Sequence, residues 1–79
     1  MKELVEVIAK ALVNHPESVH VAEFEGDRET ELTLTVDPAD MGKVIGRQGR
    51  IARAIRTVLK VQATREDKRA SLDIISEDE

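Results

Sequence analysis

Two glycines placed three residues apart, Gly46 and Gly49, interrupt a stretch that is otherwise suited to form helix. Before the pair, Asp37 can cap a helix N-terminus and Pro38 has the backbone geometry of a first helical residue. After the pair, residues 50–63 place apolar and polar side chains on opposite arcs at about 100° per residue. The glycines therefore predict two helices, a short one before them and a longer one after them.

The rest of the chain predicts one further helix and three strands. A helix over residues 2–14 is indicated by an apolar arc made of Leu4, Val7, Ile8, Ala11 and Leu12. Alternating apolar residues predict strands over residues 19–25, 30–36 and 70–76. Gly26 and Asp27 supply a turn between the first two strands. The long connection before the third strand allows it to run parallel to the second.

The resulting order of elements, α-β-β-α-α-β, indicates the α+β class. We expect a two-layer sandwich in which three helices cover one face of a three-stranded mixed sheet. A chain of 79 residues forms one domain at most. We assign that domain to residues 1–76 and expect residues 77–79 to be a frayed acidic C-terminal tail.

Composition argues against several classes of protein. The chain has no cysteine, so it has no disulfide, thiolate metal site or cysteine nucleophile, and His15 and His20 lack a third metal ligand nearby. No stretch approaches the roughly 20 apolar residues of a membrane span, and the N-terminus is unlike a signal peptide. We expect a cytoplasmic protein with no membrane insertion, no metal, no cofactor and no small-molecule substrate. Without a nucleophile and base, it is not expected to be an enzyme.

Positive charge is concentrated around the glycine pair, although the formal net charge of the chain is −4. Residues 41–69 contain nine lysines and arginines and only two acidic residues. The rest of the chain contains three basic and fourteen acidic residues. This asymmetry within one small domain indicates a surface that faces a polyanion.

The glycine pair has two interpretations. Gly46 could end one helix as a left-handed cap, and Gly49 could relax the turn into the next helix. Alternatively, two residues without side chains would let a nucleic-acid backbone approach closely, and the amides at the start of the next helix would favour a phosphate. The capping interpretation explains the glycines, but it leaves the neighbouring arginines unexplained.

Basic side chains surround the pair. Arg47 lies between the glycines and Arg50 directly follows them, with Lys43 one turn before and Arg53 one turn after. A solvated helix face would explain a polar stripe, but it would not explain why the stripe from Arg50 to Lys60 contains no acidic residue. Steering of a ligand from a distance is expected of two residues further along, Arg56 and Lys60.

Other ligand-binding motifs fit less well. A P-loop would need Gly-Lys-Ser/Thr, and a dinucleotide fingerprint would need a third glycine after a buried strand. Phe24 is the only aromatic residue and is expected in the core, so a base-stacking platform is missing. Bases would instead need an aliphatic groove. Three candidates for it, each of which could equally belong to the core, are Val44, Ile45 and Ile51.

The segment VIGRQGRIARAIR, placed between two helices after a strand, resembles the V-I-G-x-x-G signature of the K homology (KH) domain. The order of elements resembles the type II KH arrangement of bacterial proteins. The whole chain, including HPESVHV and EGDRETELTLTV, resembles the KhpA family of small single-KH RNA-binding proteins. The resemblance implies that residues 46–49 hold about four single-stranded nucleotides. It also implies a groove between the two flanking helices and the adjacent sheet edge, with Val44, Ile45 and Ile51 beneath the bases.

The resemblance to the KhpA family also implies a function. Its members are taken to be RNA chaperones or post-transcriptional regulators linked to cell shape and division, and they form homodimers or heterodimers with a larger KH-containing protein. We therefore expect a non-enzymatic protein that binds single-stranded RNA with low sequence specificity. The RNA-binding residues would be Lys43, Val44, Ile45, Gly46, Arg47, Gln48, Gly49, Arg50, Ile51 and Arg53. The alternative is a protein-interaction or dimerisation module in which RNA binding is weak or incidental.

Overall fold

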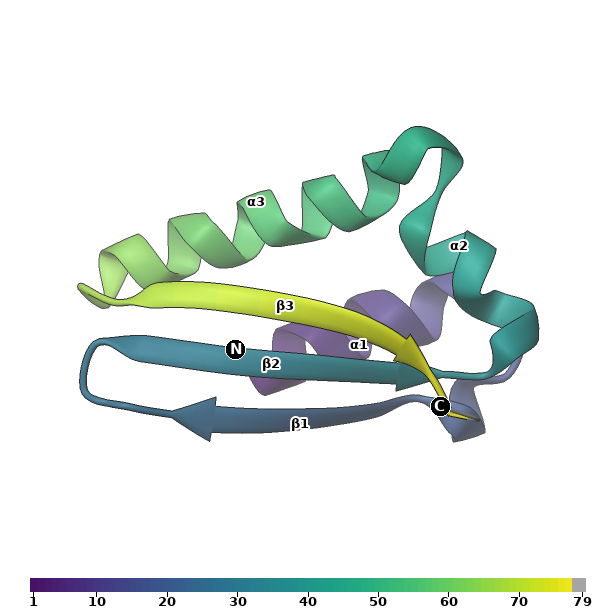
Figure 1. Ribbon diagram of the computed structural model, residues 1–79, viewed down its shortest axis with the longest axis horizontal. Helices are drawn as coiled ribbons and strands as arrows, with labels where there is room; N and C mark the ends of the chain where they lie inside the picture. Colours follow the sequence, from purple (N-terminus) through teal and green to yellow (C-terminus); the bar gives the residue numbers. More distant parts are fainter. Residues whose placement is uncertain (78–79) are drawn as a thin grey trace.

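A three-stranded sheet with helices on one face makes up residues 1–77, the part of the chain that the computed structural model describes (Figure 1). The helices are α1 (Lys2–Leu12), α2 (Met41–Ile45) and α3 (Arg50–Arg65), and the strands are β1 (His20–Glu25), β2 (Glu29–Val36) and β3 (Arg69–Ser76). Short 3-10 turns precede β1, α2 and α3: η1 (Pro16–Ser18), η2 (Pro38–Asp40) and η3 (Arg47–Gly49). The predicted class and order of elements are confirmed, and element ends differ by one or two residues.

The sheet is mixed, as predicted, with the strand order β1-β2-β3. β1 and β2 are antiparallel, and at their turn the Gly26 N–H donates to the Glu29 carbonyl at 2.7 Å. β2 and β3 are parallel, with Leu32 opposite Leu72, and α2 and α3 form the connection between them. Figure 1 shows α3 running along β3, while the loop between α2 and α3 lies at the end of the molecule where β2 and β3 end.

The hydrophobic core lies between the sheet and the helices. Alternate residues of β2 face the helices, and Leu32, Leu34 and Val36 are at most 2% exposed. The helices contribute Val5, Ala9, Val44, Ile55 and Leu59. Burying a side chain of valine, leucine or isoleucine stabilises a fold by about 1.5–3 kcal/mol. This layer therefore fixes α2 and α3 against the sheet.

The buried face of α1 differs from the predicted one. Val5 and Ala9, which the predicted apolar arc did not include, are almost fully buried, whereas Val7, Ala11 and Leu12 are exposed. The apolar arc is wider than the strip of helix that one sheet can cover. Part of the α1 apolar surface therefore remains at the surface of the domain.

The prediction that Phe24 belongs to the core is wrong, because its side chain is 69% exposed. Val21 of the same strand is buried against the helices, and side chains alternate along a strand, so Phe24 lies on the helix-free face. The inward position beside it is taken by Glu23, whose carboxylate lies 3.8 Å from the N-terminal amine. That ion pair accommodates a polar residue where the alternation suggested an apolar one.

A buried carboxylate joins the end of α1 to the start of α2. Asp40 is 1% exposed, and its two carboxylate oxygens accept hydrogen bonds from the backbone N–H groups of Asn14 (3.2 Å) and His15 (2.9 Å). The predicted cap is confirmed as well, since Asp37 accepts the N–H of Ala39 at 2.8 Å. Hydrogen bonds to charged groups contribute about 1.5–3 kcal/mol. Asp40 thus anchors the helix that leads into the glycine loop.

The predicted C-terminal tail begins within the described residues. The Glu77 N–H donates to the Val36 carbonyl at 2.9 Å, so this residue remains bonded to the sheet. Residues 78–79 lie outside the described residues.

Candidate nucleic-acid interface

The glycine loop, residues 46–49, reverses the chain between α2 and α3 with three residues at positive φ. They are Gly46 (76°), Gln48 (57°) and Gly49 (72°). The Gly46 N–H donates to the Gly42 carbonyl at 2.9 Å and ends α2, and the Gly49 N–H donates to the Gly46 carbonyl at 3.1 Å. Positive φ is easy for glycine and costs other residues about 1–2 kcal/mol. The predicted break between two helices is therefore confirmed and has a local cause.

The two glycines have different surroundings. A Cβ atom on Gly46 would lie 2.6 Å from Cγ1 of Ile51, so the Ile51 side chain packs directly beneath the Gly46 backbone. A Cβ atom on Gly49 would meet nothing within 4 Å. Gly46 is thus required by internal packing. Gly49 faces open space, where the backbone of a ligand could approach the loop.

Two arginines of α3 hold the loop in shape. Arg53 donates from Nη2 to the backbone carbonyl of Gln48 at 2.7 Å, and Arg50 donates from Nη2 to Gln48 Oε1 at 3.3 Å. The short bond uses a charged donor, which makes it stronger than a neutral one. Arg53 therefore positions the loop. The longer Arg50 contact leaves most of its guanidinium donors available.

Two further cations near the loop have no partner within the described residues. Lys43 and Arg47 are both exposed, and neither forms a hydrogen bond or ion pair with a side chain of residues 1–77. Together with Arg50 at the start of α3, they make three exposed positive charges within or next to the loop in the chain. Such a set of charges attracts a phosphate backbone.

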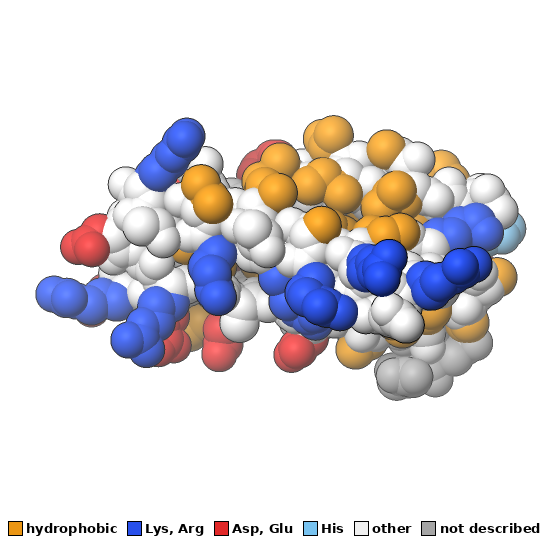
Figure 2. Space-filling model, turned by 90° about the horizontal axis from the view of Figure 1, so that it is seen from above, with side chains coloured by type: hydrophobic (Ala, Val, Ile, Leu, Met, Phe, Trp, Pro, Cys, Tyr) orange, Lys and Arg blue, Asp and Glu red, His pale blue; other side chains and the backbone are white. Residues whose placement is uncertain are grey.

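Two sides of the α3 surface flank its buried arc. The basic side, toward β3, consists of Arg53, Arg56 and Lys60; the apolar side, toward α1, consists of Ile51, Ala54 and Val58. Figure 2 shows a row of lysines and arginines along the length of the molecule beside a patch of hydrophobic side chains. The sequence pattern predicts one polar and one apolar face, but the sheet covers only part of the apolar one.

The basic side of α3 forms one wall of a groove whose other wall is β3. This α3–β3 groove has a volume of about 360 Å³ and is lined by Arg56, Leu59, Lys60, Ala70, Ser71, Leu72 and Asp73. Arg56 spans it, donating from Nε and Nη2 to the Leu72 carbonyl at 3.2 and 3.0 Å. The sequence assigns Arg56 to steering from a distance, and the family resemblance implies a groove at the sheet edge without naming the residues of β3 that form its wall. Only the parallel pairing of β2 with β3 brings these residues opposite each other.

The apolar side of α3 borders a second hollow, which lies next to α1. This α1–α3 hollow has a volume of about 330 Å³ and is lined by Ile8, Leu12, Arg50, Ile51, Ala54, Ile55 and Val58. Two large apolar side chains that line it are partly exposed: Leu12 by 36% and Val58 by 45%. Contiguous exposed apolar surface of this kind is typical of a contact with another macromolecule.

The three aliphatic residues expected beneath the bases have separate positions. Val44 is fully buried in the core, so the expectation that it contacts a base is corrected. Its place on the inner face of α2 is set by packing against the sheet. Ile45 is half-buried and packs against the core, and Ile51 is half-buried beneath Gly46, on the side of the α1–α3 hollow.

Residues 1–77 contain no group of three or more histidine, aspartate or glutamate side chains placed to hold a metal ion. None of the described helices has the length and apolar character needed to cross a membrane.

Comparison with known proteins gives one consistent result. A family model described as KhpA/KhpB, KH domain matches residues 2–74. The RNA-binding protein KhpA of Clostridium perfringens is 60% identical over 75 residues, covering 95% of this chain and 100% of that protein. The protein of the same name from Aquifex aeolicus is 48% identical over 75 residues, covering 95% of each. 

Among solved structures, the fold is similar to a chain in the crystal structure of Era in complex with MgGDPNP and nucleotides 1506–1542 of 16S ribosomal RNA. The TM-score is 0.56 at 21% identity, and the match covers 95% of this chain and 29% of that chain. The likeness supports the α+β fold described above.

Proposed function

The chain belongs to the KhpA/KhpB family of KH domains, and from that premise we propose that it binds single-stranded RNA through the glycine loop. Its curated relatives are named RNA-binding proteins. The proposed role is non-enzymatic: the loop grips about four nucleotides by their backbone, as KH loops do.

The observation that carries this proposal is the combination of an open backbone with uncompensated charge. Gly49 leaves open space at the loop backbone, and three exposed cations lie within or next to the loop in the chain: Lys43, Arg47 and Arg50. The loop's shape is held by Arg53 through Gln48, so the grip is formed before the RNA arrives. Preorganisation of this kind lowers the cost of ordering the loop on binding.

Replacing two loop residues tests the proposal directly. The double variant Arg47→Asp with Gln48→Asp places two negative charges where a phosphate would lie, and we expect it to abolish binding in a gel shift with an unstructured RNA. The matched control is Lys2→Asp with Lys10→Gln, which changes the net charge equally at two exposed positions of α1. Circular dichroism should show both variants folded. Unchanged affinity of the loop variant would refute the assigned role.

Salt dependence provides an independent measure of the same contacts. Each phosphate neutralised on a single strand lowers the slope of log K against log salt by about 0.7. Three available cations at the loop therefore predict a slope of about −2 from the loop contacts. A flat salt dependence would argue against backbone binding.

The cellular part of the proposal is that the protein acts in the cytoplasm as an RNA chaperone or post-transcriptional regulator. Support comes from the curated relatives, which are named RNA-binding proteins; the lack of an exposed aromatic side chain near the glycine loop within residues 1–77 favours backbone contacts over base stacking. Crosslinking in cells followed by sequencing should recover many RNAs without a shared long motif. Recovery of a single RNA species would contradict low specificity.

A second candidate function is protein pairing, and the apolar side of α3 favours it. We propose that the α1–α3 hollow is covered by a second copy of this chain or by a larger KH-containing protein, with α3 against α3. In sedimentation equilibrium after nuclease treatment, Val58→Asp should dissociate a dimer that Lys60→Gln leaves intact. A wild-type chain that stays monomeric at all concentrations would exclude self-association.

A further inference from the structure

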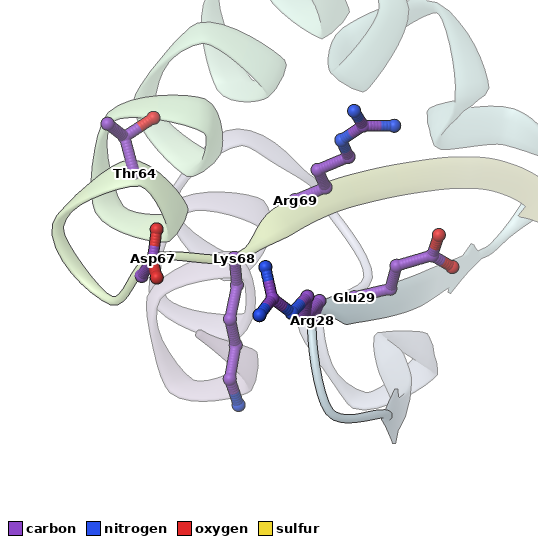
Figure 3. A pocket seen from close by; sticks show the side chains of 6 residues that line it. All are labelled: Arg28, Glu29, Thr64, Asp67, Lys68 and Arg69. Atoms are coloured by element: carbon purple, nitrogen blue, oxygen red, sulfur yellow. The ribbon is translucent and has the colours of Figure 1, made fainter.

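The positive charge does not end at the α3–β3 groove. At the opposite end of α3 from the glycine loop, a cavity of about 380 Å³ is lined by Arg28, Glu29, Thr64, Asp67, Lys68 and Arg69 (Figure 3). Its three cations, which we call the distal cluster, come from the β1–β2 turn (Arg28), from the turn between α3 and β3 (Lys68) and from the start of β3 (Arg69). Figure 2 shows lysine and arginine side chains at this end of the molecule too.

The distal cluster is held together by the backbone. The Arg69 N–H donates to the Arg28 carbonyl at 2.8 Å, and the Lys68 N–H donates to the Ala63 carbonyl at 2.8 Å. Asp67, at φ 58°, makes the sharp turn between α3 and β3. The backbones of Arg28 and Arg69 are thus held side by side, although the two residues are 41 positions apart in the chain.

The charges of the distal cluster are only partly neutralised. Lys68 Nζ lies 2.6 Å from Glu25 Oε1, and this bond lowers the pKa of the Glu25 carboxyl and raises the pKa of the Lys68 amine. Among residues 1–77, no ion pair joins Arg28 or Arg69 to an acidic group, although Glu29 and Asp67 line the same cavity. Arg28 and Arg69 are therefore not ion-paired within residues 1–77, although acidic residues outnumber lysines and arginines in the chain.

A continuous path connects this cluster with the glycine loop. The basic side of α3 carries Arg53, Arg56 and Lys60 along one face, and a helix of 16 residues is about 24 Å long. The loop itself accounts for about four nucleotides at one end of that path. A strand leaving the loop toward β3 would pass the α3–β3 groove and reach the distal cluster.

We propose that the distal cluster is a second RNA contact, in which Arg28 and Arg69 bind phosphates of the same strand that the glycine loop grips. This inference rests on the proposed function and extends it: the ligand is an RNA longer than four nucleotides, laid along α3. The α3–β3 groove and its cations then contribute to affinity as well as to steering.

The test compares two RNA lengths and two variants. Oligouridines of about 5 and about 15 nucleotides are titrated into the wild type and into Arg28→Gln with Arg69→Gln. The control is Lys2→Gln with Lys10→Gln, which removes the same charge from the exposed surface of α1. All four substituted side chains are exposed, so folding should be unaffected, and circular dichroism checks this.

The distal variant should bind the short RNA as tightly as the wild type does. For the long RNA it should lose about fivefold or more in affinity, and its salt slope should become shallower by about 1.4, the value for two phosphate contacts on a single strand. The control should leave both RNAs unaffected. A longer RNA gains some affinity from its many binding registers, but every variant shares that gain.

Two outcomes overturn the distal contact while the proposed function stands. Either the distal variant binds the long RNA as the wild type does, or it loses affinity equally for both lengths, which would indicate general attraction only. If the wild type binds neither RNA, the proposed function fails, and the distal contact fails with it.

Discussion

The two exposed sides of α3 have opposite chemistry. The side toward β3 carries Arg53, Arg56 and Lys60, whereas the side toward α1 carries Ala54 and Val58. The two sides flank the buried arc and meet on the outer face of the helix, where Lys60 and Val61 line one hollow, so one helix presents two surfaces of different character. The difference suggests that RNA and a protein partner need not compete, since a basic groove suits the first and an apolar hollow suits the second.

The glycine loop repeats this division at the start of the helix. Gly46 packs on Ile51, which belongs to the apolar side, while Gly49 opens to solvent among the cations. The signature G-x-x-G therefore contains one glycine that serves packing and one that serves access.

The largest expected effect comes from Gly46→Ala. The new Cβ would lie 2.6 Å from Ile51, and alanine tolerates a φ of 76° poorly. We expect the free energy of unfolding to fall by about 2–4 kcal/mol, measured by urea denaturation. Gly42→Ala is the matched control, because a Cβ at that helical position meets nothing within 4 Å and should stabilise by up to about 1 kcal/mol. Equal effects of the two substitutions would remove the packing role of Gly46.

Gly49→Ala should have a smaller effect on stability and a clear effect on binding. Its left-handed backbone makes alanine cost about 1–2 kcal/mol, while the added methyl group meets no protein atom. The methyl group would stand where the RNA backbone approaches, so RNA affinity should fall although the protein stays folded. Isothermal titration of the folded variant measures this, and wild-type affinity would show that the space above Gly49 is unused.

Arg53→Lys separates charge from positioning on the basic side. Lysine keeps the charge but cannot reproduce the guanidinium bond to the Gln48 carbonyl, a charged bond whose exposure to solvent reduces its contribution to about 0.5–1.5 kcal/mol. We expect RNA affinity to fall, whereas Lys60→Arg, which keeps its charge and lacks a loop bond, should change little. If Arg53→Lys and Lys60→Arg both lose RNA affinity to the same degree, the bond from Arg53 to the Gln48 carbonyl is not the cause of the loss.

The smallest effect is expected at the exposed pair of Lys68 and Glu25. The Glu25 pKa lies below its ordinary 4.5, so its share of stability is present above that pH and is lost as the pH falls further. The Lys68 pKa lies above its ordinary 10.5, so its share is lost as the pH rises beyond that value. Unfolding curves of Lys68→Ala and the wild type should differ slightly between these limits and converge outside them. A difference that does not become smaller as the pH falls below 4.5 would contradict the ion pair.

The fold could be predicted from the sequence because three signals agree: apolar periodicity, the cap formed by Asp37 and Pro38, and the glycine break. Which part of each apolar face becomes buried could not be predicted from the sequence. Periodicity identifies the apolar arc of α1 but not which part of it the sheet will bury: the arc includes Val7, which is exposed, and does not include Val5, which is buried. Phe24 was misplaced for a similar reason, because an ion pair to the N-terminus allows Glu23 to point inward.

The candidate site, too, could be predicted only in part. The loop and the cations next to it are local in the sequence and were found there. The β3 wall of the groove, the Arg56 bond to Leu72 and the Asp40 bonds to Asn14 and His15 join residues at least 16 positions apart. Such contacts follow from strand pairing and packing, and no local pattern records them.

The parallel pairing of β2 with β3 also has a consequence for how the chain reaches its native state. Every pair, such as Leu32 with Leu72, joins residues 40 positions apart, so this half of the sheet closes a large loop and should slow folding relative to a helical bundle. During synthesis at about 5–20 residues per second, β2 waits about 2–8 s for its partner. One edge of a strand rich in leucine and threonine is unpaired during that time. A refolding time of microseconds, as for helical bundles, would contradict this expectation.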